Sequence, residues 1–230
     1  MHIPDGLIAL PVSVAAIAIA APVVAASTHR AGRHLVDREI PVTGLVVAYL
    51  VVAQLLVFPL GLGTSAHLIG AGLALVLVGP AVAITCVSIV LVIQALLLAD
   101  GGITALGLNA LNSGIVPILA GWVVLALVLR AAGGRRRALP IAAGSAAAVG
   151  VLAGAAVFCL EYWAGGPDAI PAGQVAIGML GGHVVIAVLE GVLTGLLVAA
   201  IVRVRPDLLR RNLGRAPAVA PPAPPQRVAP

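Results

Sequence analysis

The chain begins with Met1-His2, a pair of residues that can chelate a metal ion. The α-amine of Met1, the main-chain nitrogen of His2 and Nδ1 of its imidazole can close fused rings around one ion. Borderline divalent ions such as Ni²⁺, Cu²⁺ and Co²⁺ accept nitrogen ligands, whereas Ca²⁺ and Mg²⁺ prefer oxygen. The three nitrogens lie in one plane and leave a fourth corner open. For His2 alone, an ordinary frayed terminus is the competing interpretation.

His67 is the candidate for the fourth corner. It follows a glycine-containing stretch, Gly61–Ala66, at the mouth of an expected membrane span. The topology predicted from the charges places it on the same side as Met1. Four nitrogens in a plane suit Ni²⁺ or Cu²⁺ and are accepted by Co²⁺, whereas Zn²⁺ prefers a tetrahedron. The alternative is an imidazole that only caps a helix or lies at the interface, but together with His2 the pattern favours a ligand.

Four more polar residues are candidates for supporting this site. Asp100 and Asn109 belong to a glycine-rich stretch, where Asn109 can hydrogen-bond an imidazole or a main-chain group. An ordinary glycine-rich connector is the alternative. His183 and Glu190 lie seven residues apart in the last apolar stretch, so they share a helix face and point into the bundle. Such a buried pair can relay protons or tie helices together.

The elements that must position these residues are membrane helices. Hydrophobic residues make up 61% of the 230 residues and charged residues 9%, with a mean hydropathy of +1.17. A span needs roughly 20 apolar residues. The sequence therefore predicts an all-α integral membrane protein of about seven spans, the third of them short and separated from the fourth by Gly79-Pro80. The expected spans are Leu7–Ala26, Pro41–Leu60, His67–Val78, Ala81–Ala99, Ser113–Leu129, Leu139–Trp163 and Val175–Val202.

The basic residues predict the orientation. All 13 are arginines, and they follow the first, fifth and seventh expected spans. The positive-inside rule makes those places cytoplasmic, so the N-terminus is expected outside and the C-terminus inside the cell membrane. Residues 1–202 form the membrane-embedded domain, and residues 203–230 a basic, Pro/Ala-rich, disordered cytoplasmic tail near anionic lipids. Aromatic residues make up only 3%, and no basic groove is evident, so no nucleic-acid partner is expected.

Several of these residues resemble motifs of one family, the CbiM/NikM substrate-specific components of energy-coupling-factor transporters. The likeness extends to about Val202, and its most specific parts are the N-terminal motif and the motif around His67. The matching segments are Met1-His2-Ile3-Pro4-Asp5-Gly6, Pro59 through His67-Leu68-Ile69-Gly70, Gln94-Ala95-Leu96, Asp100-Gly101-Gly102-Ile103, Leu106-Gly107-Leu108-Asn109, and His183 with Glu190-Gly191-Val192-Leu193-Thr194.

The resemblance implies capture of Co²⁺ or Ni²⁺ outside the membrane, for cobalamin synthesis or for nickel enzymes. It implies a planar site made by the Met1 amine, the His2 amide, the His2 imidazole and the His67 imidazole. The ion is the transported substrate, and no cofactor is expected. The implied partners are a transmembrane coupling subunit, two cytoplasmic ATPases and a separate small accessory membrane subunit. The chain has no GxxxxGK[ST] loop, so ATP hydrolysis is expected on those partners.

Two other interpretations remain open. One is a self-sufficient secondary transporter or channel in which His183 and Glu190 relay protons. The scarcity of charged residues in most spans argues against it. The other is a membrane enzyme that uses His67, His183 and Glu190 on a metal. A planar nitrogen site leaves little room for an activated water, so hydrolysis is disfavoured and a transport subunit, not an enzyme, is expected.

Overall fold

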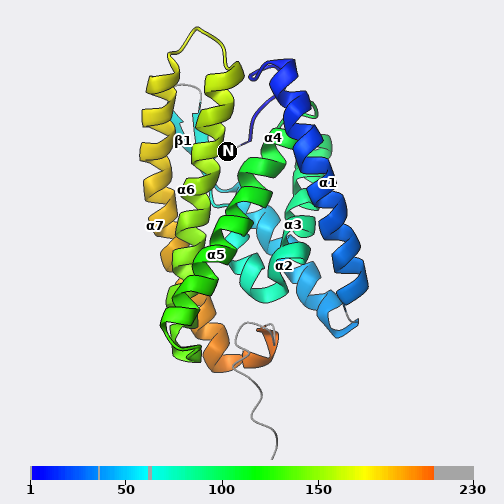
Figure 1. The fold of residues 1–230 in the computed structure, drawn as a ribbon, viewed down its shortest axis with the longest axis vertical. Helices are drawn as coiled ribbons and strands as arrows, with labels where there is room; N and C mark the ends of the chain where they lie inside the picture. The colour runs from blue at the N-terminus through cyan, green and yellow to red at the C-terminus, as the bar shows by residue number, and fades with distance from the viewer. Residues whose placement is uncertain (1, 36, 62–63, 210–230) are drawn as a thin grey trace, which may run out of the picture.

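The computed structural model describes residues 2–35, 37–61 and 64–209, and it is a bundle of long helices (Figure 1). The all-α membrane class is thus confirmed, with one small β-hairpin as an exception. The helices are α1 (Leu10–His34), α2 (Ile40–Leu55), α3 (Ala71–Leu97), α4 (Leu106–Ala110), the π-helix η2 (Leu111–Ile115), α5 (Val116–Ala131), α6 (Leu139–Gly165) and α7 (Ala172–Val204), with 3₁₀ turns η1 (Asp37–Glu39), η3 (Arg136–Ala138) and η4 (Pro206–Leu208); the strands are β1 (Val57–Gly61) and β2 (Thr64–His67).

Five helical segments of the described chain are long and apolar enough to cross a membrane, where seven were expected. They are Leu10–Arg33, Ala71–Leu97, Leu106–Ala131, Arg136–Gly165 and Ala172–Val204. The second expected span is a shorter helix, α2, and the third and fourth expected spans form one element, α3. Large apolar side chains such as Trp163 and Ile177 face outward, as a lipid-facing surface requires.

Helix α3 folds back on itself at Gly79. The backbone there is not helical (φ 77°, ψ 171°), and Pro80 follows. A straight helix of this length would separate its ends by about 40 Å. However, His67 before its start and Asp100 after its end both contact His2. The two halves must therefore run in opposite directions, and the break expected at Gly79-Pro80 is confirmed.

The expected second span was wrong at its end. Helix α2 stops at Leu55, and the chain turns into the antiparallel hairpin β1–β2, in which Val57 pairs with His67 and Phe58 with Ala66. Pro59 cannot donate the main-chain hydrogen bond that a continuing helix needs, and the β-branched and aromatic residues before it favour a strand. His67 is therefore the last residue of a strand that packs against α7, and not the first residue of a helix.

The glycine-rich stretch is shorter than expected. Helix α4 begins at Leu106, so Asn109 and Asn112 are helical and buried instead of lying in an outer loop. Segments α4, η2 and α5 run on as one long helical segment, Leu106–Ala131. Both asparagines find hydrogen-bond partners on other segments, which makes their burial acceptable.

The helices pack closely where glycines face one another. A Cβ atom on Gly144 of α6 would lie 2.6 Å from the carbonyl oxygen of Gly191 on α7, and one on Gly150 would lie 2.7 Å from that of Pro117 on α5. Such contacts let backbones approach directly, as is typical of membrane helices.

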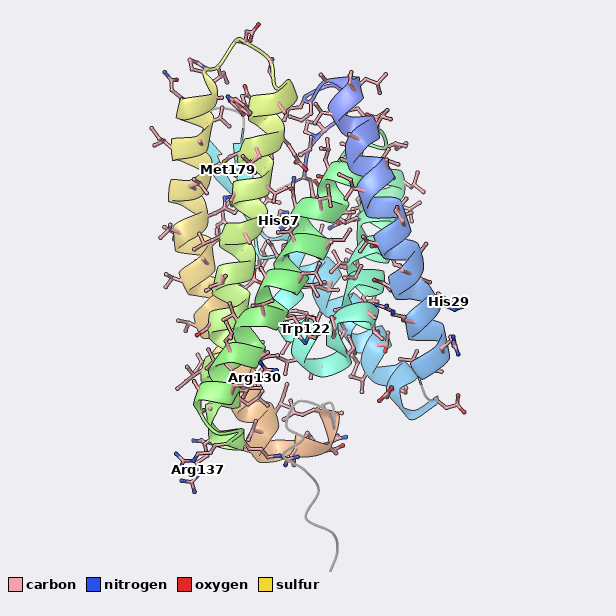
Figure 2. All side chains as sticks on the ribbon, viewed as in Figure 1. His29, His67, Trp122, Arg130, Arg137 and Met179 are labelled. Carbon is pink, nitrogen blue, oxygen red and sulfur yellow. The ribbon has the colours of Figure 1, made fainter. Side chains whose placement is uncertain are left out.

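Arg130 and Arg137 lie at the far end of the bundle from His67 (Figure 2). Most of the tail predicted for 203–230 lies outside the described residues, which end at 209.

Candidate metal centre

The N-terminal segment is held inside the bundle by its main chain. The Ile3 N–H donates to Oδ1 of Asn109 at 2.8 Å, and Nδ2 of Asn109 donates back to the Ile3 carbonyl at 3.1 Å. That carbonyl also accepts the N–H of Gly102 at 2.8 Å. The Ile3 side chain is buried. Asn109 thus acts on the main chain next to His2, which is one of the two roles that the sequence predicted for it.

Asp5 fastens the same segment to the loop before α4. Its carboxylate accepts the N–H of Thr104 at 2.7 Å, the Thr104 hydroxyl at 2.5 Å and the N–H of Ile103 at 3.2 Å. These bonds hold the pKa of Asp5 below its ordinary value, and the bond from the Thr104 hydroxyl has the largest effect. Gly102 must lack a side chain, because a Cβ there would collide with Asp5.

The structure brings His2 and His67 together, although 64 residues lie between them in the sequence. Their ring centroids lie 4.4 Å apart, with the ring planes tilted by 31°. The His2 side chain is 4% exposed and His67 is 1% exposed. Met1, the third predicted contributor, lies outside the described residues. Figure 2 shows His67 deep between the helices, in the half of the bundle away from Arg130 and Arg137.

The ring nitrogens of the two histidines differ in what they contact. Nδ1 of His67 lies 2.9 Å from the Leu68 carbonyl, so it carries the proton, and Nε2 presents its lone pair to the buried interior. Nδ1 of His2 lies 2.9 Å from Oδ2 of Asp100, and this contact holds the pKa of Asp100 below its ordinary value. In both rings Nε2 is buried without a hydrogen-bond partner among the described residues.

The Asp100 contact bears on the predicted chelate. That chelate uses Nδ1 of His2, the atom that faces Asp100 here. An ion bound at Nδ1 would replace the Asp100 contact, because Nδ1 has only one position for a proton or a ligand. Among the described residues no three His, Cys, Asp or Glu side chains converge on one point. An ion between His2 and His67 therefore needs further ligands from the main chain or the terminus.

Glu190 holds the segment that follows His67. One carboxylate oxygen accepts the N–H of Ile69 at 2.6 Å and the other accepts the N–H of Gly70 at 2.9 Å. Gly70 has φ 75°, and a Cβ there would press on Leu50 and Tyr49. Gln54 adds a bond to the Ile69 carbonyl at 3.1 Å. Glu190 therefore positions His67 through its main chain.

His183 is buried on the same face of α7, as the seven-residue spacing predicted. Its Nδ1 lies 2.8 Å from the Met179 carbonyl, one turn earlier in the helix, and its Nε2 has no partner among the described residues. His183 is also close enough to His67 for the two imidazoles to interact electrostatically. The predicted supporting residues, Asp100, Asn109, His183 and Glu190, thus all lie around the two imidazoles or the segments that carry them.

One buried acidic residue was missed by the sequence analysis. Glu161 of α6 accepts Nδ2 of Asn112 at 2.6 Å, and both side chains are buried. The signal was present, since a carboxyl group inside an expected span, Leu139–Trp163, is costly in the same way as Glu190. Its place near the end of that span made it easy to read as exposed.

Comparison with known proteins identifies the family. Residues 2–208 match the family model CbiM, described as the cobalt uptake substrate-specific transmembrane region. The fused nickel transport protein NikMN of Rhodobacter capsulatus is 38% identical over 174 residues, which are 70% of this chain and 49% of that protein. The cobalt transport protein CbiM of Geobacter sulfurreducens is 34% identical over 172 residues, 72% of this chain and 47% of that protein.

A solved structure has the same fold. A truncated transition metal transporter superimposes with a TM-score of 0.75 at 27% identity, covering 88% of this chain and 98% of that one. The fold is that of a membrane protein of the metal-transport class. The chain belongs to the CbiM family, as the N-terminal and His67 motifs predicted. It spans about half the length of the two curated relatives named above.

Proposed function

We propose that this chain captures Co²⁺ or Ni²⁺ as the substrate-binding subunit of an ATP-driven importer. The observation that carries the proposal is the buried contact between His2 and His67, with an unpartnered Nε2 on each ring. Imidazole nitrogen is a ligand for both ions. The names of the relatives, a nickel transport protein and a cobalt transport protein, support the same pair of substrates.

The proposed ligands are the Met1 amine, the His2 amide nitrogen, the His2 imidazole and Nε2 of His67. Because the described side chains form no metal centre by themselves, ligands from the terminus and the main chain are what this site requires. The bonds of Asn109 to Ile3 and the contacts of Asp5 hold the main chain of the N-terminal segment in place. Asp100 then has two roles, as the partner of His2 before binding and as a negative charge beside the bound ion.

The proposed partners are a coupling subunit, two ATPases and a small accessory membrane subunit, with the N-terminus outside and the C-terminus in the cytoplasm. The grouping of arginine-bearing ends at one end of the bundle supports that orientation. The relative from Methanocorpusculum labreanum is named a fused cobalt transport protein CbiMQ, and this chain covers only 26% of it. The fused name and the small share covered support a partner protein that works together with the region matched by this chain.

Metal titration and uptake test the proposal together. The purified chain should bind Co²⁺ and Ni²⁺ by calorimetry, and His67→Gln should weaken binding by about 100-fold or more, since one of four nitrogens is lost. His29→Gln, at an exposed position on α1, is the matched control and should bind normally. Cells should accumulate the ion only when the ATPases are also present. Uptake without any ATPase would instead support a secondary transporter.

The structure makes that second candidate less favourable. Both carboxylate oxygens of Glu190 accept main-chain N–H groups of Ile69 and Gly70, so the group is already in use as a structural acceptor. His183 bonds to Met179 of its own helix and not to Glu190. The two residues that a proton relay would need therefore have other contacts.

A further inference from the structure

His183 carries a ring nitrogen that the proposed capture site does not use. The Nδ1–H group donates to the Met179 carbonyl at 2.8 Å, which leaves the lone pair on Nε2. The side chain is fully buried, and this Nε2 has no partner among the described residues. His67 is arranged in the same way, with Nδ1 bonded to the Leu68 carbonyl and Nε2 free. Two buried imidazoles thus each present a lone pair with no donor.

Figure 2 places His67 a little below Met179, and His183 lies one turn further down α7, so the two imidazoles lie at a similar height along the bundle. Glu190 bonds to Ile69, and His183 lies seven residues before it, about 10 Å along the helix axis. His67 lies two residues before Ile69, at most about 7 Å along an extended chain. Strand β2, which ends in His67, packs on α7, the helix that carries His183. His183 is also near enough to His67 to act on it electrostatically.

We infer that His67 and His183 form a second position for the ion, bound through the two Nε2 atoms, into which it passes from the N-terminal chelate. The inference rests on the proposed capture of Co²⁺ or Ni²⁺. The ion stays on His67 and exchanges the nitrogens of Met1 and His2 for that of His183. Nitrogen ligands suit these borderline ions, so the second position selects the same chemical class as the first.

This second position is weaker than the first, and its function needs that. It has two protein nitrogens, because no third His, Cys, Asp or Glu of the described chain converges there. The nearest acidic group on the same face of α7, Glu190, is held by two main-chain N–H groups. An ion bound by two imidazoles and water can leave, whereas one held by four nitrogens in fused rings leaves slowly. Transport requires both binding and release.

The test separates the two positions with Co²⁺ as the probe. One extra residue before Met1 removes the terminal chelate in the full-length protein. That extended protein is compared with versions that also carry His183→Asn, His183→Gln or His67→Gln. Asparagine keeps a donor for the Met179 carbonyl and lacks the distal nitrogen, so it guards against a mere packing defect. His29→Gln in the extended protein is the control. Calorimetry gives the affinity, and the visible spectrum of Co²⁺ reports its ligands.

The extended protein should keep a weaker Co²⁺ site. His183→Asn or His67→Gln should lower the Co²⁺ affinity of this site by a further factor of about ten. The control should not change it. The inference is overturned if the folded extended protein binds no Co²⁺, or if both His183 variants bind it as the extended parent does, as they would if water alone joins the two rings. A failure of the proposed capture site looks different: the extended protein would then bind as tightly as the native one.

Discussion

Asn109 of helix α4 holds Ile3 from both sides, accepting its N–H at 2.8 Å and donating to its carbonyl at 3.1 Å. This pair of bonds does for the N-terminal segment what a neighbouring strand would do. It fixes the main chain one residue after His2. The main chain beside the proposed capture site is therefore positioned by a helix that is far away in the sequence.

Replacement of Asn109 should loosen the N-terminal segment. Asn109→Leu is similar in size and leaves the Ile3 N–H and carbonyl without that partner, at a cost of about 1–3 kcal/mol. Metal affinity should fall about tenfold or more as the terminus loosens. Asn112→Leu is the matched control, because Asn112 lies on the same helical segment and bonds to Glu161. Hydrogen exchange of the N-terminal amides should rise in the first variant only; equal exchange in both would contradict this role of Asn109.

Replacement of Glu190 should weaken metal binding by His67 indirectly, through the main chain of Ile69 and Gly70. Glu190→Gln replaces two acceptor oxygens with one oxygen and one NH₂ group, so Ile69 or Gly70 loses its partner and faces a donor. Co²⁺ affinity should fall by about 10–100-fold, as is usual when a residue that orients a ligand is lost. Glu161→Gln is the control, since its amide oxygen can still accept from Asn112. If both variants bind Co²⁺ normally, Glu190 does not position His67.

Asp5 predicts a pH effect with a definite sign. Its pKa is lowered in the folded chain, so the ionised form favours docking to Thr104. The stabilisation is present above the ordinary pKa of 3.8 and is lost as the pH falls through the lower folded value. Asp5→Asn imitates the acid form and should speed exchange of the Thr104 amide at neutral pH. Thr104 exchange that is the same in both proteins would show that the carboxylate does not hold this loop.

Close helix contacts predict which glycines tolerate a methyl group. A Cβ on Gly107 of α4 would collide with the main chain of Ile17 on α1, so Gly107→Ala should destabilise the bundle by about 1–3 kcal/mol. Gly181→Ala on α7 meets nothing within 4 Å and should be neutral or stabilising by up to about 1 kcal/mol. Thermal unfolding of both variants tests the packing of α1 on α4, which equal stability would contradict.

The membrane class, the family and the approach of His2 to His67 were predictable from the sequence, because apolar length and a specific N-terminal motif are local signals. The shared face of His183 and Glu190 followed from helix periodicity. The reversal at Gly79 followed from the prediction of two successive spans on either side of Gly79-Pro80, but their continuity as one kinked element did not. The β1–β2 hairpin was hidden inside an apolar run, where strands and helices look alike.

The contacts that orient the site were beyond a sequence-based prediction. The bond of Glu190 to Ile69 and Gly70 joins residues about 120 positions apart through main-chain N–H groups, which leave no trace in residue type. The same is true of Asn109 and Ile3. The contact of Asp100 with Nδ1 of His2 was likewise not specified, although Asp100 was named as a supporting residue.

One titration tests whether the chain's own N-terminus binds the ion. The native chain and a version with one residue added before Met1 are titrated with Co²⁺ and with Ni²⁺ by calorimetry, with folding checked by circular dichroism. We expect the extended protein to remain folded and to lose tight binding of both ions. Equal, tight binding by the two proteins would contradict this expectation, and the site would then have to be rebuilt on His67 and His183.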